Sequence, residues 1–186
     1  MTETIYYLPG YGGQLQTGLG QGLLDRGFNV TGRQTTGDFR GLPFSDQVGV
    51  VADDLKTHFW QDTARVVANS FGAYLFLHAQ AQLPAFPGRV LLLSPIVGGF
   101  TDDEKGMNFL PPLPERLQEL VRDGLLPVPR ICEIHVGSQD WQSNPQNVTR
   151  MADALGSPVS VVPGAGHMLG RDYVGKILDT WLPQLR

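Results

Sequence analysis

The hydrophobic residues of this chain form two kinds of pattern that alternate along it. Short runs rich in β-branched residues are typical of strands, whereas longer segments with hydrophobic residues at i, i+3, i+4 and i+7 are typical of helices. The alternation predicts an α/β fold class, a three-layer α/β/α arrangement with a mainly parallel six-stranded sheet. The six predicted strands are Thr4–Leu8, Phe28–Arg33, Arg65–Asn69, Arg89–Leu93, Ile131–Val136 and Val159–Val162. Because the third and fourth are almost continuously hydrophobic, we expect them at the centre of the sheet with both faces covered.

Helices are predicted between these strands. One follows a cap at Ser45, and another is started by Asn144 and Pro145 and ended by Gly156. Leucines between Leu15 and Leu24 indicate a first helix that ends at Gly27, although three glycines within it each cost about 1 kcal/mol relative to alanine. The remaining predicted helices are a hydrophobic one directly after Ser70, a short one at Glu115–Arg122 and a last one at Asp172–Leu182.

The segment 98–129 interrupts this rhythm. It contains a glycine pair, the acidic patch Asp102–Glu104 and a proline-rich stretch from Phe109 to Pro114. With neither internal repeats nor a linker in view, we expect residues 1–186 to form a single domain with a short lid-like insertion at about 98–129.

Composition narrows the classes of function. The chain has 186 residues, 41% of them hydrophobic, so it is long enough to bury a sizeable core. Its net charge is −4 and its basic residues are scattered, which argues against nucleic acid as a partner. No hydrophobic run approaches the roughly 20 residues that span a bilayer, and no signal segment opens the chain, so we expect a cytoplasmic protein without a membrane partner. The single cysteine, Cys132, and four histidines without metal-ligand spacing predict neither a disulfide nor a metal site.

Ser70 lies at the junction of the third predicted strand and the hydrophobic helix that follows. A sharp strand-to-helix turn needs small residues two positions before and after its serine, and Ala68 and Gly72 meet that need. Such a turn would lift the Ser70 hydroxyl clear of the sheet. It would also place the Phe71 N–H at a helix N-terminus, directed at developing negative charge.

A serine hydroxyl becomes a useful nucleophile only when a base takes its proton. Asp140 follows the fifth predicted strand and His167 follows the sixth. Because the carboxyl ends of parallel strands meet at one edge of a sheet, these loops are expected to bring acid, histidine and Ser70 together. Asp102 and Asp103 are the rival acids, nine or ten residues beyond the fourth strand.

On these residues the sequence resembles the small, lid-poor members of the α/β-hydrolase family, and the resemblance covers nearly the whole chain. The order Ser70, Asp140, His167 is the order of the family's catalytic triad. Ala68 stands where the G-x-S-x-G motif has its first glycine, and the family's two N-terminal strands are missing. The resemblance implies a serine hydrolase for a carboxylic ester, thioester or related acyl bond, acting on a small-molecule substrate without a cofactor.

The family's oxyanion loop has a counterpart in Leu8-Pro9-Gly10-Tyr11-Gly12-Gly13, with proline in place of the usual histidine. By this match the backbone N–H groups of Tyr11 and Phe71 would form the oxyanion hole, and Gly10 would lie against the substrate. The hydrophobic residues Phe100, Phe109, Leu110 and Leu113 either wall an acyl-binding pocket or belong to ordinary packing.

Each of these candidate catalytic residues also has a purely structural interpretation. Ser70 is also suited to cap its helix, and Asp140 and His167 to serve as turn residues. His58, His78 and His135 fall within predicted helices or a strand and are expected to be structural, as is Cys132.

At the level of function, the alternative is a hydrolase-like scaffold that binds a protein or ligand without turnover. A nucleotide-binding domain is a third hypothesis, because glycines follow the first strand. It is disfavoured because Leu15 occupies the position of the third glycine in G-x-G-x-x-G.

Overall fold

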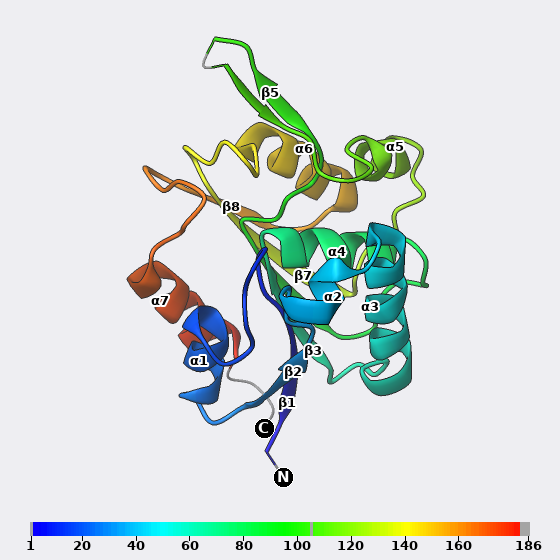
Figure 1. The fold of residues 1–186 in the computed structure, drawn as a ribbon. Coiled ribbons are helices and arrows are strands. Elements are labelled where there is room, and N and C mark those ends of the chain that lie inside the picture. Colours follow the sequence, from blue (N-terminus) through cyan, green and yellow to red (C-terminus); the bar gives the residue numbers. More distant parts are fainter. Residues whose placement is uncertain (1, 105, 183–186) are drawn as a thin grey trace.

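The computed structural model describes residues 2–104 and 106–182. Its main sheet has six parallel strands in the order β2-β1-β3-β4-β7-β8 (Figure 1). These strands are β1 (Thr4–Leu8), β2 (Asn29–Gly32), β3 (Arg65–Asn69), β4 (Arg89–Leu93), β7 (Ile131–Gly137) and β8 (Val159–Val162). All six predicted strands are confirmed, and the two most hydrophobic ones, β3 and β4, lie at the centre.

Helices cover both faces of this sheet, which gives the predicted three layers (Figure 1). The seven helices of the described residues are α1 (Gly18–Leu24), α2 (Gly37–Gly41), α3 (Phe44–His58), α4 (Phe71–Gln80), α5 (Arg116–Arg122), α6 (Pro145–Leu155) and α7 (Arg171–Trp181). Alternate strand residues enter two separate cores. In β3, Val66 packs in the core beneath α3, α4 and α6, and Val67 packs in the core beneath α1 and α7. This period of two explains why a strand covered on both faces reads as a continuous hydrophobic run.

The termini of α6 follow the sequence prediction. The Asn144 side chain accepts a hydrogen bond from the Asn147 N–H at 3.0 Å, Pro145 is the first helical residue, and Gly156 ends the helix with a φ of 62°. A left-handed residue at this position is readily supplied by glycine, which lacks a Cβ.

Two helix starts were predicted wrongly. Ser45 does not cap α3, because the helix begins one residue earlier, at Phe44, with Pro43 in the cap position. The first helix begins at Gly18 rather than near Leu15, because Gly18 has a φ of 53°, which interrupts a helical path from Leu15. A Cβ on Gly20 would lie 2.0 Å from the Leu15 carbonyl oxygen, so glycine there permits a close return of the chain.

Between β4 and α5 the chain forms a two-stranded antiparallel hairpin of β5 (Phe100–Asp102) and β6 (Met107–Phe109). The hairpin projects beyond the carboxyl edge of the main sheet (Figure 1). The proline-rich stretch that follows it is tied to α4, because the Tyr74 hydroxyl donates to the carbonyl oxygens of Pro112 at 2.7 Å and Leu113 at 3.0 Å. Segment 98–129 is therefore anchored to the helix that follows β3.

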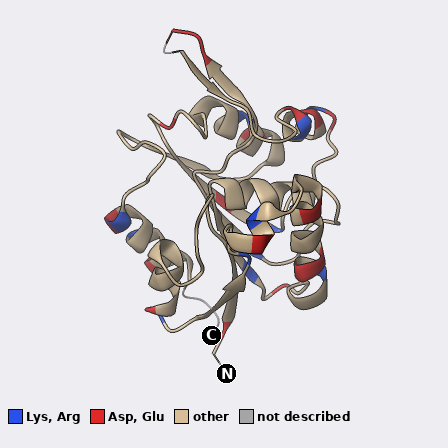
Figure 2. Ribbon diagram, viewed as in Figure 1, with Lys and Arg blue, Asp and Glu red and all other residues tan. Residues whose placement is uncertain are grey.

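Charged residues are spread over many elements of the fold (Figure 2). No helix among residues 2–104 and 106–182 has the length and hydrophobicity that a membrane span requires.

Candidate active site

Ser70 occupies a strained turn between β3 and α4. Its φ of 53° and ψ of −120° are conformations that a non-glycine residue seldom adopts. Ser70 also fixes the neighbouring strand end: its N–H donates to the Leu93 carbonyl at 3.0 Å. A Cβ on Gly72 would come within 2.0 Å of the Leu8 carbonyl oxygen, and Ala68 is fully buried. The small residues that the sequence offers on both sides of Ser70 are therefore required by packing.

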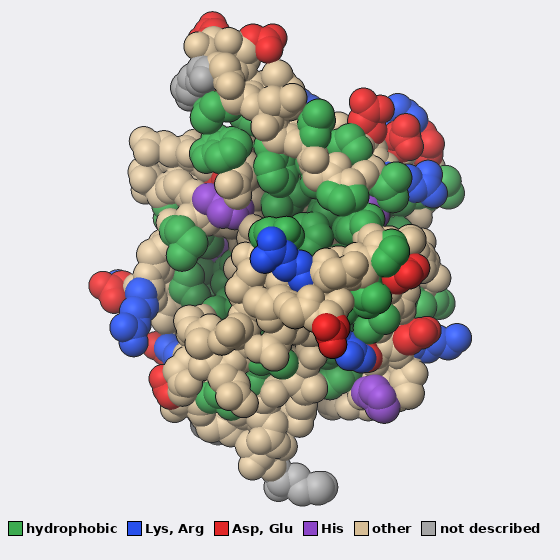
Figure 3. Space-filling view, in the orientation of Figure 1, with side chains coloured by type: hydrophobic (Ala, Val, Ile, Leu, Met, Phe, Trp, Pro, Cys, Tyr) green, Lys and Arg blue, Asp and Glu red, His purple; other side chains and the backbone are tan. Residues whose placement is uncertain are grey.

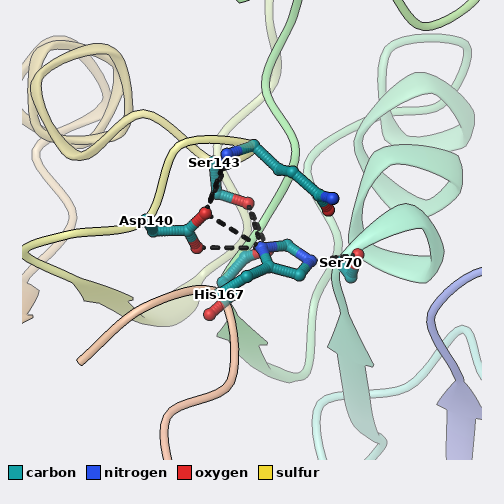
Figure 4. A network of polar contacts seen from close by, with 6 residues as sticks. Ser70, Asp140, Ser143 and His167 are labelled. Carbon is teal, nitrogen blue, oxygen red and sulfur yellow. Dashed lines mark hydrogen bonds and ion pairs between the residues drawn. The ribbon is translucent and has the colours of Figure 1, made fainter. Parts of the chain in front are cut away.

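The loops after β7 and β8 bring an acid and a histidine to this serine, as predicted (Figure 4). The Ser70 Oγ lies 2.7 Å from His167 Nε2. His167 Nδ1 lies 3.0 Å and 2.9 Å from the two carboxylate oxygens of Asp140. Since a carboxylate only accepts hydrogen bonds, the arrangement favours the tautomer with the proton on Nδ1, which leaves Nε2 free to accept from the Ser70 hydroxyl.

Backbone amides fix the Asp140 carboxylate in its orientation. Its side chain is completely buried, and its Oδ1 accepts hydrogen bonds from the N–H groups of Gln142 at 3.0 Å and Ser143 at 2.8 Å. These two bonds hold the carboxylate in the orientation that faces His167. The acid held against His167 is thus Asp140, whereas the rival Asp102 belongs to the hairpin strand β5.

Ser143 is a part of this network that the sequence did not reveal. Its hydroxyl donates to the Ser94 carbonyl at 2.6 Å and lies 3.5 Å from His167 Nδ1 (Figure 4). Ser143 thereby joins the acid-bearing loop to the end of β4. In the sequence, Ser143 is marked only by lying three residues after Asp140. A serine near an aspartate is too common for that spacing to predict a role.

The loop after β1 lies against the Ser70 turn. A Cβ on Gly10 would be 3.2 Å from the Cβ of Ser70 and 3.1 Å from Asn69 Nδ2, so the backbone of Gly10 approaches the serine closely. Among the described residues, the N–H groups of Tyr11 and Phe71 donate to no protein acceptor. The two amides that the sequence singled out are therefore available to a ligand.

Thr35 holds this loop in shape and was missed by sequence reasoning. It is 1% exposed, and its hydroxyl donates to the Gly10 carbonyl and accepts from the Gly13 N–H at 2.9 Å. Its backbone N–H donates to the Gly13 carbonyl, and its carbonyl accepts from the Gly12 N–H, both at 3.1 Å. These contacts occupy the amides of Gly12 and Gly13 and leave that of Tyr11 free.

Aromatic side chains cluster next to Ser70 and next to Asp140. Figure 3 shows hydrophobic side chains gathered between the hairpin and the centre of this face. Phe71 packs against the ring of Phe44 at 6.2 Å and that of Tyr11 at 5.7 Å between centroids. Phe109 meets the ring of Trp141, the residue after Asp140, at 6.3 Å. Three of these aromatic residues, Tyr11, Phe44 and Trp141, have side chains that the sequence did not assign to an acyl-binding pocket.

The residues predicted to wall an acyl pocket divide into two groups. Phe109 reaches the acid-bearing loop through its contact with Trp141. Phe100 lies opposite Phe109 in the hairpin, and Leu110 is 65% exposed beside Gly99. The structure thus places Phe109 against the residue that follows Asp140, Phe100 in the hairpin, and Leu110 at an exposed position just after it.

The histidines and the cysteine that we expected to be structural lie away from Ser70. His135 is buried and bonded to the Tyr173 hydroxyl at 2.9 Å and to Glu133 at 2.8 Å. His78 lies within α4, where burial lowers its pKa to about 4. Burial also raises the pKa of the Cys132 thiol to about 12, so this cysteine stays protonated. Within residues 2–104 and 106–182, no cluster of three or more histidine, cysteine or acidic side chains is suited to a metal ion.

Comparison with known proteins shows the fold of this chain. No family model matches the sequence, and no curated protein matches it. Among solved structures, the mouse α/β hydrolase domain-containing protein 10 matches with a TM-score of 0.67 and 15% identity, over 97% of this chain and 88% of that one. The ydeN gene product of Bacillus subtilis matches with a TM-score of 0.67 and 14% identity, over 98% and 100%.

A third match comes from work on carboxylesterases of the archaeon Nitrososphaera gargenis. Its TM-score is 0.63 at 12% identity, over 97% of this chain and 89% of that one. At such low identities the likeness establishes a shared architecture, and chemistry has to be argued from the site itself.

Proposed function

The chain has the α/β-hydrolase fold, and from this premise we propose that it is a serine hydrolase that cleaves a carboxylic ester, a thioester or a related acyl bond. One observation carries the proposal. The Ser70 Oγ lies 2.7 Å from a histidine nitrogen, and the other nitrogen of that ring faces the buried carboxylate of Asp140. A serine that only capped its helix would not need this partner, and the Ser70 side chain forms no cap hydrogen bond in α4.

In the proposed reaction, His167 Nε2 takes the proton of the Ser70 hydroxyl as the oxygen attacks the acyl carbon. Asp140 holds the imidazole in the required tautomer and stabilises the imidazolium that forms. The imidazolium then protonates the leaving group, the bond to it breaks, and the acyl group remains on Ser70. Water activated by the same histidine releases the acid and restores the hydroxyl.

The free N–H groups of Tyr11 and Phe71 are proposed to bind the negative oxygen of the tetrahedral intermediate. Donors of this kind act on charge that develops in the transition state, and losing one costs about 2.7–4 kcal/mol in the barrier. Because Thr35 occupies the neighbouring amides, it acts here as a positioning residue for Tyr11.

The acyl group is proposed to extend along the hydrophobic wall. Phe71 and Phe109 would line this path, with Phe100 and Leu110 at its outer end, and no cofactor takes part. A wall of this kind binds carbon chains mainly through burial of hydrophobic surface, at roughly 25 cal/mol per Å².

Labelling of Ser70 by a fluorophosphonate tests the proposal. The wild-type protein should be labelled stoichiometrically on Ser70 and should hydrolyse p-nitrophenyl esters, with a rate that depends on acyl chain length. Ser70→Ala should abolish labelling and lower kcat on the order of 10⁶-fold, as nucleophile removal does in another serine hydrolase.

Ser45→Ala is the matched control, because Ser45 is exposed at the start of α3 and should leave both measurements unchanged. A folded wild-type protein that is neither labelled nor active would refute the proposal. That result would favour the non-catalytic binding scaffold.

A further inference from the structure

An arginine of α2 lies over the loop that carries the proposed oxyanion donor. The guanidinium carbon of Arg40 is 4.3 Å from the centroid of the Tyr11 ring, and its Nε donates to the Tyr11 hydroxyl at 3.0 Å. Stacking on an aromatic face fixes the plane of a guanidinium while its edge stays open to further hydrogen bonds. Arg40 is therefore oriented by Tyr11 without using its terminal nitrogens.

The charge of Arg40 has no partner in the described part of the chain. Arg33, seven residues earlier, is paired with Asp54 through two contacts of 2.6 Å. Arg40 forms no such pair among these residues, and Asp38 of the same helix forms none with it. A terminal N–H edge that meets no protein acceptor is available to a ligand.

The Arg40 guanidinium is connected to the Ser70 turn through the ring of Tyr11. Tyr11 supplies one of the proposed oxyanion donors through its backbone N–H, and its ring meets the ring of Phe71, the residue after the serine, at 5.7 Å between centroids. The Tyr11 ring therefore contacts both the Arg40 guanidinium and the residue that follows the serine. Figure 3 shows basic and histidine side chains at the border of the hydrophobic area on this face.

We infer that Arg40 forms an anion-binding subsite that selects acyl groups ending in a carboxylate. This inference rests on the proposed function, because it concerns the substrate of the same site. A carboxylate matches the fork of a guanidinium, and charge-assisted bonds of this kind are stronger than neutral ones. A purely hydrophobic wall would instead penalise such a group for losing its water.

Two probes that differ in one group test the inference. Both are alkyl fluorophosphonates of equal chain length, one ending in a carboxylate and the other in a methyl group. The measured quantity is the second-order rate constant for labelling of Ser70. In the wild-type protein the carboxylate probe should react faster than the methyl probe. Arg40→Gln should lower the ratio of the two rate constants by about two- to fivefold, the size of one exposed ion pair.

Two further variants separate charge from structure. Arg130→Gln makes the same change of charge at the start of β7, the opposite edge of the sheet, and should leave both rate constants unchanged. Arg40→Lys keeps the charge and should keep part of the preference. High salt should reduce the wild-type ratio, because the subsite is open to solvent.

The outcomes distinguish the two proposals. If the methyl probe labels Ser70 and the carboxylate probe is not preferred, the subsite is refuted while the hydrolase proposal stands. If Arg40→Gln slows both probes equally, Arg40 only supports Tyr11, and the subsite is again refuted. If neither probe labels a folded wild-type protein, the hydrolase proposal itself fails, and the subsite fails with it.

Discussion

Replacing Thr35 by valine tests whether one buried hydroxyl shapes the oxyanion loop. Valine has nearly the same volume as threonine but has no hydroxyl, so Thr35→Val removes the donor to the Gly10 carbonyl and the acceptor of the Gly13 N–H. The backbone bonds of residue 35 to the loop stay available. The substitution therefore isolates the contribution of the side chain.

The size of the effect follows from the two hydrogen bonds of the hydroxyl that are lost. The Gly13 N–H and the Gly10 carbonyl keep the 2.9 Å bond that joins them, so neither is left without a partner. At about 0.5–1.5 kcal/mol for each lost bond, the free energy of unfolding should fall by about 1–3 kcal/mol. Loss of a complete oxyanion donor lowers kcat about 10²–10³-fold. Since Thr35→Val displaces the Tyr11 N–H rather than deleting it, kcat should fall by about ten- to a hundredfold, with a smaller change in KM.

Urea unfolding gives the stability, and ester hydrolysis at a temperature where the variant is fully folded gives kcat and KM. Thr35→Ser keeps the hydroxyl and should restore most of kcat, although it loses a buried methyl group. The reasoning fails if Thr35→Val keeps the kcat of the wild type, or if Thr35→Ser is as slow as Thr35→Val. Either result would mean that the hydroxyl does not position Tyr11.

Two further predictions concern α4. Gly72→Ala should destabilise the protein by more than the roughly 1–3 kcal/mol of ordinary overpacking, because its Cβ would lie 2.0 Å from the Leu8 carbonyl oxygen. In Gly49→Ala, the control, the new Cβ has open space within α3, and urea unfolding should show a gain of up to about 1 kcal/mol. Burial lowers the pKa of His78 to about 4 in the folded protein, against 6.5 for an exposed histidine. Between these two pH values the unfolded chain binds a proton at His78 that the folded protein does not bind. The free energy of unfolding should therefore fall by about 2 kcal/mol from pH 7 to pH 5 because of this histidine. His78→Phe should show a pH-dependent loss that is smaller by this amount. An equal loss in the wild type and the variant would contradict the prediction.

The parallel sheet could be predicted because its strands are buried on both faces. Val66, Val67 and Leu91 are fully buried, and a strand in that position reads as a hydrophobic run whatever its neighbours are. The hairpin strands β5 and β6 carry no such signal, since each has three residues with a polar one in the middle. Their pairing depends on the path of the chain, which a local pattern does not contain.

The candidate triad could be predicted from order and position, since Ser70, Asp140 and His167 each follow a strand of the same parallel sheet. Thr35 and Ser143 could not, because they act through hydrogen bonds to backbone atoms of distant loops. Nothing in a loop sequence distinguishes a threonine that makes such contacts from one that faces water. The single-domain organisation and the cytoplasmic location remain predictions.

The hydroxyl of Tyr74 joins the helix that follows Ser70 to the segment that carries the hairpin. Tyr74 stands one helical turn after Ser70, and it anchors the proline-rich stretch at Pro112 and Leu113. The two hairpin strands, β5 and β6, come before this anchor in the chain. The strands β5 and β6 can thus be lengthened or shortened while the helix that presents the serine keeps its place.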